Sequence, residues 1–219
     1  MADGMGGHVA GKTASLIAVT EVKAFFDQHP DDKNLPPVPD TNLSLPAQKL
    51  KQAIEHAGQS IFDAGKQDAE LKGMGSTIVS LFVAGDTAYI AHVGDSRLYR
   101  LRDQELSQLT QDHSLVGKML RKGEITPEEA RRHPQRHIIT RALGTQTTKV
   151  DMQEQPLVDG DTFLLCSDGL YGMVAEDDIK AAMLAPVEEF ESAGRNLIAL
   201  ANQQGGADNI TLIMVRTHF

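Results

Sequence analysis

Residues 76–93 have the sequence STIVSLFVAGDTAYIAHV, and this stretch decides the fold. It contains two runs of β-branched and apolar residues, Ser76–Ala84 and Thr87–Val93, which are typical of strands. Gly85-Asp86 between them is one of the two-residue pairs that close tight hairpins. The stretch therefore predicts two antiparallel strands.

The strand pattern extends outward from this hairpin. Further strands are predicted at 97–101, 105–109, 162–166 and 210–215. We expect the first two to continue the meander, with turns at 94–96 and 103–104. The run 162–166 is apolar throughout, which indicates a buried strand that ends at Ser167-Asp168-Gly169.

Helical spacing dominates the two ends of the chain and a small insert in its middle. Helices are predicted at 8–28, from Pro46 through Ile61, and at 115–122, 126–132, 176–184 and 187–203. The five prolines between His29 and Pro46 indicate an irregular surface loop. Because helices surround a run of hairpins, the sequence predicts an α+β fold in which helices cover an antiparallel sheet core.

Composition limits the classes of function. The 219 residues are 41% hydrophobic, which predicts a single globular domain over 1–219. A net charge of −9 argues against nucleic acid as a partner. The single Cys166 cannot form an intramolecular disulfide, and the chain has neither a run of 18 apolar residues nor an apolar leader. We therefore expect a cytoplasmic protein without a membrane segment.

Three acidic residues lie beside turn-forming residues at the ends of predicted elements, in Asp3-Gly4, Asp168-Gly169 and Asp208-Asn209. Each pair alone is an ordinary turn. Together they supply the hard oxygen ligands that Mg²⁺ or Mn²⁺ prefers, whereas a zinc site lacks the thiolates and paired histidines it would need.

A rival interpretation is a nucleotide hydrolase, because Gly6–Thr13 formally matches the phosphate-binding P-loop G-x-x-x-x-G-K-[ST]. A P-loop follows a buried strand of a parallel sheet, and only five residues precede Gly6. This alternative is therefore remote.

The ordered motifs resemble those of the bacterial protein phosphatase 2C family, the metal-dependent serine/threonine phosphatases. The matching segments are DGMGGH at 3–8, GST at 75–77, GDSR at 94–97, LTQDHS at 109–114, TRALG at 140–144, SDGL at 167–170 and GADNIT at 206–211. The resemblance implies a central sandwich of two antiparallel sheets flanked by helices. It also implies hydrolysis of phosphoserine and phosphothreonine in proteins by a hydroxide that bridges two Mn²⁺ or Mg²⁺ ions, without a catalytic side chain.

The resemblance also implies roles for individual residues. Asp3 would bridge both metals, the Gly4 carbonyl would bind one of them, and Asp168 and Asp208 would hold the other. Asp112 matches the ligand of a weaker third ion. The implied partners are phosphorylated proteins, namely a serine/threonine kinase and its substrates, in bacterial signalling.

Family members also carry an earlier Arg-x-x-Asn-Glu-Asp segment, which this chain lacks ahead of Met1-Ala2-Asp3. In the family, the Arg of this segment binds the substrate phosphate and its acidic residues contribute to the metal centre. We therefore expect the phosphatase activity of this chain to be impaired. The alternative function is a truncated, phosphatase-like binding module.

The segment 113–140 resembles the flap beside the active site of bacterial members. Between Gly117 and His137 it has six Lys and Arg residues against three Glu, a local charge of +3. A solvated helical surface with mixed charge explains this equally well. The functional hypothesis is that Arg131 and Arg132 guide phosphorylated substrates toward the metals.

Overall fold

The computed structural model describes residues 1–30, 35 and 42–219, and of His8 the backbone alone. The loop expected at 29–46 therefore lies mostly outside the described residues, and its described part forms no helix or strand before Leu45. By internal packing the chain divides into two compact units. The first unit comprises residues 2–94 and 140–156, and the second comprises Met1, 95–139 and 157–219.

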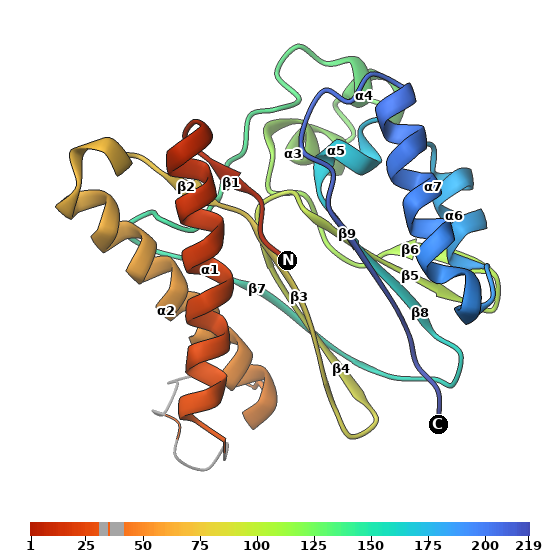
Figure 1. Cartoon of the computed structure of the whole chain (residues 1–219), viewed down its shortest axis with the longest axis horizontal. Helices are drawn as coiled ribbons and strands as arrows, with labels where there is room; N and C mark the ends of the chain where they lie inside the picture. Colours follow the sequence, from red (N-terminus) through yellow and green to blue (C-terminus); the bar gives the residue numbers. More distant parts are fainter. Residues whose placement is uncertain (31–34, 36–41) are drawn as a thin grey trace. The chain divides into compact units, whose positions relative to one another are not determined.

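The first unit combines two long helices with a three-stranded sheet (Figure 1). Its helices are α1 (His8–Gln28), α2 (Leu45–Gln67) and the 3₁₀ turn η2 (Ala69–Leu71), and its strands are β1 (Gly4–Met5), β2 (Gly75–Ser76), β3 (Ile78–Ala84), β4 (Thr87–Val93) and β7 (Asp151–Pro156). The sheet has the order β3-β4-β7, and β1 pairs with β2; all pairs are antiparallel. The predicted hairpin is confirmed, because Ala84 lies opposite Thr87.

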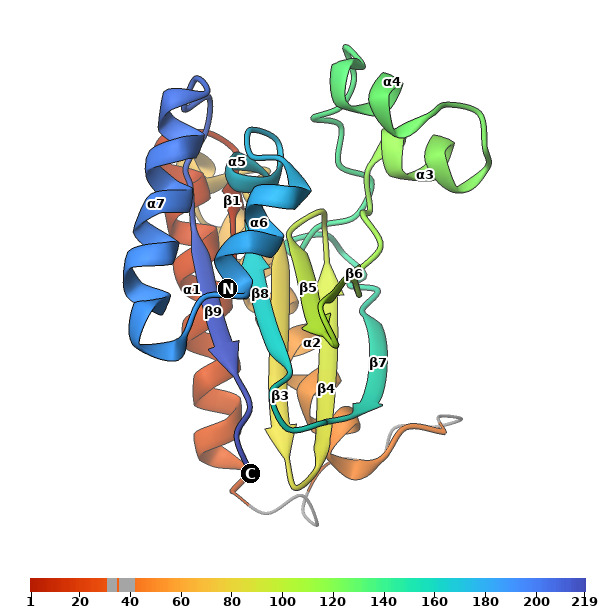
Figure 2. The same cartoon turned by 90° about the vertical axis from the view of Figure 1, so that its right-hand side faces the viewer.

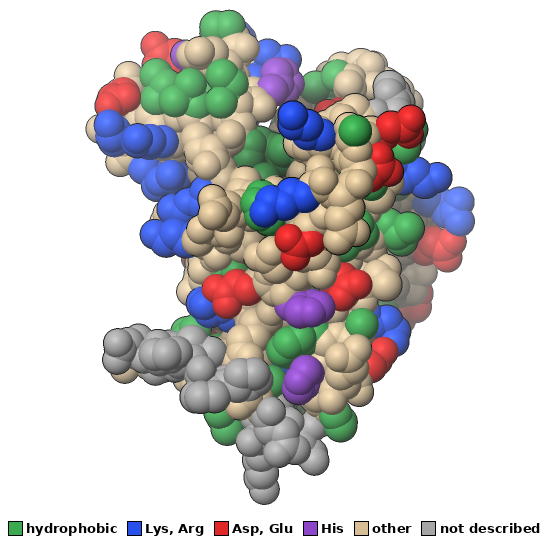
Figure 3. Space-filling model, turned by 90° about the vertical axis from the view of Figure 1, so that its left-hand side faces the viewer, with side chains coloured by type: hydrophobic (Ala, Val, Ile, Leu, Met, Phe, Trp, Pro, Cys, Tyr) green, Lys and Arg blue, Asp and Glu red, His purple; other side chains and the backbone are tan. Residues whose placement is uncertain are grey.

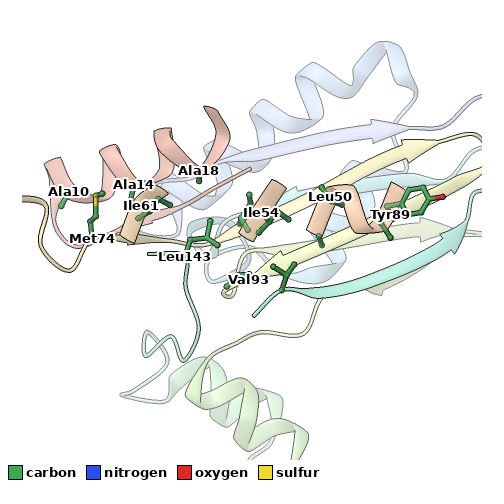
Figure 4. Packing of buried hydrophobic residues seen from close by; sticks show 14 residues of the cluster. Ala10, Ala14, Ala18, Leu50, Ile54, Ile61, Met74, Tyr89, Val93 and Leu143 are labelled. Carbon is green, nitrogen blue, oxygen red and sulfur yellow. The ribbon is translucent and has the colours of Figure 1, made fainter. Parts of the chain in front are cut away.

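Small residues bring the helices of the first unit close together. Ala10, Ala14 and Ala18 recur along one stripe of α1, and all three are buried. They pack in one cluster with larger side chains of α2, β4 and the segments around them, as Figure 4 shows. The labelled partners are Leu50, Ile54, Ile61, Met74, Tyr89, Val93 and Leu143.

The second unit combines a four-stranded antiparallel sheet with several helices (Figure 2). Its strands are β5 (Arg97–Arg102), β6 (Glu105–Gln108), β8 (Thr162–Cys166) and β9 (Leu212–Arg216), in the order β6-β5-β8-β9. Its helices are α3 (Leu115–Arg121), α4 (Pro127–Arg132), α5 (Asp168–Tyr171), α6 (Glu176–Met183) and α7 (Phe190–Gln203), with the 3₁₀ turn η3 (Val187–Glu189). Strand β8 is central and buried throughout, as its apolar sequence predicts.

The α+β class, with antiparallel sheets flanked by helices, is confirmed, but the sequence-based prediction misplaces one strand and misses another. Strand β5 does not continue the meander of β3 and β4, because it pairs with β6 and β8. The chain changes sheets at Gly94, whose φ of 106° few other residues adopt. Strand β7 was not predicted, because its sequence DMQEQP is polar and it lies at a sheet edge.

No described helix is both long enough and apolar enough to cross a membrane. Figure 3 shows basic and acidic side chains mixed over the face it presents. Such mixing follows from a composition of 21 Lys and Arg against 30 Asp and Glu.

One buried ion pair joins strand β5 to the start of β8 in the second unit. The Asp161 side chain is fully buried, and Arg102 donates to it from Nε at 2.7 Å and from Nη2 at 2.6 Å. The Val158 N–H also donates to Asp161 Oδ2, at 3.0 Å. Burial opposes ionisation of Asp161, but these hydrogen bonds outweigh it, so the pKa of this carboxyl is lowered.

Replacing Asp161 by Asn should therefore lower the free energy of unfolding by about 2 kcal/mol at pH 7. An acid whose pKa is depressed by folding stabilises the protein above its unfolded pKa, about 3.9, and loses that effect as pH falls through the folded value. The difference between the wild type and Asp161→Asn should therefore shrink below about pH 4. Urea unfolding followed by circular dichroism measures it, and a constant difference from pH 7 to pH 3 would contradict the prediction.

Candidate metal centre

The end of strand β8 presents Asp168 beside the turn that carries Asp208. The two segments are joined at Ser167, whose hydroxyl donates to the Asn209 carbonyl at 3.0 Å and accepts from the Thr211 N–H at 3.1 Å. Gly169 makes this approach possible, because a Cβ there would lie 2.4 Å from the Asn209 carbonyl oxygen. The predicted Asp168 and Asp208 are therefore held near one another.

Asp168 has the chemistry of a metal ligand. Its Oδ1 atom is buried and has no hydrogen-bond partner among the residues that the structure describes. Burial, followed by the charge of Asp208, raises the pKa of the Asp168 carboxyl. A divalent cation would satisfy the unpaired oxygen and offset the repulsion between the two carboxylates, so these residues fit the metal expected from the sequence.

Both aspartates line a cavity of about 340 Å³ within the second unit. Its acidic lining residues are Asp95, Asp112, Asp168, Glu176 and Asp208. Asp95 is buried. It was not predicted as a site residue, because GDSR at 94–97 has the composition of an ordinary turn. The position of the Asp95 carboxylate just after a predicted apolar strand could have indicated a site residue.

Asp112 also lines the cavity, but its charge is already compensated. Arg97 donates to Asp112 from Nη2 at 2.7 Å and from Nε at 3.0 Å and 3.3 Å, so the guanidinium spans both carboxylate oxygens. Gln108 Nε2 adds a hydrogen bond at 3.1 Å to Oδ1. A cation at Asp112 would have to compete with Arg97, so this carboxylate fits a metal less well than Asp168 does.

Asp3 and Gly4 belong to the first unit, at the start of the chain. The Asp3 carbonyl accepts from the Thr77 N–H at 2.8 Å and from the Ser76 hydroxyl at 3.0 Å, which fixes this segment beside β2. Gly4 lies against the first turn of α1, since a Cβ on Gly4 would come 1.8 Å from the Gly11 carbonyl oxygen. Only glycine fits at this position.

The basic side chains of the flap divide between the cavity and the solvent. Arg131 and Arg136 line the cavity together with His137. Arg132, although exposed and adjacent in sequence, is not among the lining residues. The structure thus brings one of the two predicted flap arginines to the cavity and adds Arg136, which the sequence analysis counted only in the net charge.

Comparison with known proteins decides the family. A sequence profile described as protein phosphatase 2C matches residues 1–212. The chain belongs to the protein phosphatase 2C family. The P-loop alternative does not hold, because every described strand pair is antiparallel.

Two members of the protein phosphatase 2C family illustrate the similarity in sequence. The serine/threonine phosphatase stp of Listeria monocytogenes is 39% identical over 220 residues, which cover 98% of this chain and 82% of stp. The serine/threonine protein phosphatase PstP of Mycobacterium tuberculosis is 38% identical over 214 residues, again 98% of this chain. The chain spans only 39% of the length of PstP.

Solved structures show the same fold. The crystal structure of Mycobacterium tuberculosis PstP/Ppp superposes with a TM-score of 0.86 and 36% identity, covering 100% of this chain and 87% of that one. The PstP catalytic domain in complex with two manganese ions has a TM-score of 0.83 and 35% identity, covering 100% of this chain and 86% of that one. The α+β fold of this phosphatase family is therefore the fold of this chain.

Proposed function

We propose that this chain hydrolyses phosphoserine and phosphothreonine in proteins with the help of two divalent metal ions, Mn²⁺ or Mg²⁺. The observation that carries the proposal is the Oδ1 of Asp168, which is buried beside Asp208 in a cavity and has no hydrogen-bond partner in the described part of the chain. Family membership supports it, and so does the metal complex of PstP, which holds two manganese ions.

The proposed ligands in the second unit are Asp168 and Asp208. The roles of the Asp3 carboxylate and the Gly4 carbonyl as metal ligands stay predictions from the family resemblance. Ions bound by these residues would supply an activated water nucleophile and neutralise phosphoryl oxygens. Asp168 and Asp208 hold their positions through the Ser167 hydrogen bonds, and Arg131 and Arg136 present positive charge to a phosphate dianion in the cavity. A weaker third ion at Asp112 is the less supported part of the proposal, since Arg97 already pairs with it.

Two nucleophilic side chains, Cys166 and Ser167, directly precede Asp168 in the sequence, and neither can replace an activated water as the nucleophile. Cys166 is fully buried, and burial raises the pKa of its thiol to about 12, so it is not a thiolate at neutral pH. The Ser167 hydroxyl is buried and committed to hydrogen bonds with Asn209 and Thr211. Neither Cys166 nor Ser167 is therefore a nucleophile in the proposed reaction.

The proposal is tested by phosphate release from a phosphothreonine peptide with Mn²⁺, with Mg²⁺ and with chelator, while calorimetry measures metal binding. Metal-dependent release supports it. Metal binding without release would instead support the phosphatase-like binding module. The same proposal includes a cytoplasmic location, which is supported by the single, buried Cys166 without a disulfide. It also includes a serine/threonine kinase as the enzyme that phosphorylates the substrates, because the substrate class requires one.

The flap arginines should affect large substrates more than small ones. Reversing charge in Arg131→Glu/Arg132→Glu should lower the ratio of kcat/KM for a phosphopeptide to that for p-nitrophenyl phosphate by about tenfold at low salt. The decrease should diminish as salt screens the charges.

The single variants Arg131→Glu and Arg132→Glu form a matched pair, because each makes the same charge change, the first in the cavity lining and the second outside it. Arg132→Glu should change the ratio by less than Arg131→Glu does. Equal slowing of both substrates, or an effect that salt does not weaken, would show that the flap is an ordinary solvated surface.

A further inference from the structure

The cavity that holds Asp168 and Asp208 also has an uncharged wall. Its apolar lining residues include Val116, Leu120, Pro127, Ala130 and Met173. Four of them belong to the flap helices α3 and α4, which lie next to one another in Figure 2, and Met173 follows α5. We call this set the apolar wall. A phosphate group and its metals use charged and polar partners, so they leave the apolar wall without a function in the reaction.

The apolar wall is held in place before any ligand arrives. The Leu115 N–H donates to the Ile138 carbonyl at 2.9 Å, which closes the base of the flap. The Ser114 hydroxyl caps α3 through the Gly117 N–H at 3.1 Å, and Thr126 with Glu129 forms a capping box on α4. A side chain that packs on the apolar wall therefore meets an ordered surface and does not have to order it.

The charges around the apolar wall indicate what it binds. Arg131 and Arg136 line the same cavity, and so does the proposed metal pair Asp168 and Asp208. The occupant thus carries a phosphate and an aliphatic group within a short distance of each other. A cavity of about 340 Å³ is at the small end for ligand sites, and it has room for one phosphorylated side chain and one neighbour.

We propose that the apolar wall binds an aliphatic side chain within two residues of the phosphorylated residue of a substrate protein. This inference rests on the proposed phosphatase function and narrows its substrate class to phosphopeptides with Leu, Ile, Val or Met beside the phosphosite. Removal of such a side chain from water on binding would make the affinity for these peptides higher than for peptides with a polar neighbour.

The test compares two phosphothreonine peptides of equal length and charge, one with Leu and one with Ser at the flanking positions. The wild-type chain with Mn²⁺ should favour the Leu peptide in kcat/KM by about tenfold. Leu120→Gln places an amide on the apolar wall and should bring the ratio close to one. The ratio cancels any uniform loss of activity, so a general effect on folding does not imitate this result.

Leu184→Gln is the matched control. Leu184 is 46% exposed at the end of α6 and does not line the cavity, so this variant should keep the wild-type preference. If Leu120→Gln lowers the unfolding temperature, Met173→Gln serves as the second variant on the apolar wall. It should also bring the ratio of kcat/KM for the two peptides closer to one.

The same peptides bound to the metal-free chain, followed by fluorescence anisotropy, decide the inference independently of turnover. Tighter binding of the Leu peptide, lost in Leu120→Gln, supports it. Equal kcat/KM and equal affinity for the two peptides would overturn it while leaving the phosphatase function intact. Absence of hydrolysis of any phosphoester with Mn²⁺ would instead overturn the proposed function, and the binding ratio would still decide the role of the apolar wall.

Discussion

Asp208→Asn is expected to reduce Mn²⁺-dependent hydrolysis of p-nitrophenyl phosphate by at least about 100-fold, because it removes one of the charged ligands that hold a metal beside Asp168. Calorimetry should show weaker Mn²⁺ binding by the same variant. Asp177→Asn is the control, since Asp177 is an exposed acid on α6 outside the cavity, and it should leave both measurements unchanged.

The stability of Asp208→Asn should change in opposite directions with and without metal. Without metal, the charge of Asp208 raises the pKa of Asp168, which means that the two carboxylates repel each other. The asparagine variant should therefore unfold at a slightly higher temperature than the wild type in chelator, but gain less stability on addition of Mn²⁺. Unchanged turnover together with unchanged Mn²⁺ affinity would exclude Asp208 from the metal centre.

Local sequence signals predicted most of the regular structure. Helix α1 begins and ends at His8 and Gln28 as predicted, and β8 occupies Thr162–Cys166 as predicted. Helix α1 was predictable from the helical spacing of its own apolar residues, and β8 from its own continuous apolar run. The pairing of β5 with β8 depends on residues more than 60 positions apart, such as Arg97 and Cys166, which no local pattern encodes.

The candidate site was predictable to the same extent. Asp168 and Asp208 were identified because each lies in a short motif with its own turn residue. The pairing of Arg97 with Asp112 was not identified, because it joins β5 to the segment before the flap across 15 residues. The phase of α4 likewise separates Arg131 from Arg132, and a helix of six residues is too short for its buried side to be predicted reliably from spacing.

Arg97 stands at a junction of three segments in the second unit. Besides its hydrogen bonds to Asp112, it donates from Nη1 to the Tyr99 hydroxyl at 2.8 Å. Its guanidinium also lies 3.7 Å from the centre of the Tyr171 ring, at the end of the short helix that begins with Asp168. Arg121 of α3 donates to the Asp112 carbonyl at 3.0 Å, so the same junction includes the flap.

Arg97→Ala should therefore lower the free energy of unfolding by about 3 kcal/mol, because it leaves Asp112, 10% exposed, as a nearly buried charge without its cation. Arg97→Lys should recover part of this loss, since an ammonium keeps the charge but lacks the planar group that spans two oxygens and stacks on Tyr171. Adding Asp112→Asn to Arg97→Ala should cost less than the sum of the two single changes, because the unpaired charge is then gone.

The control for Arg97 is Arg195→Ala, which breaks an ion pair of similar length, 2.6 Å to Glu191, between side chains that are 76% and 79% exposed. Water already solvates both of those groups, so the loss should be under about 0.5 kcal/mol. Denaturant unfolding of these five variants, including Asp112→Asn alone, gives the comparison. If Arg97→Ala and Arg195→Ala cost the same, burial does not strengthen the Arg97 pair. The flap and helix α5 would then be held by contacts other than the Arg97 ion pair, such as the hydrogen bond from the Leu115 N–H to the Ile138 carbonyl.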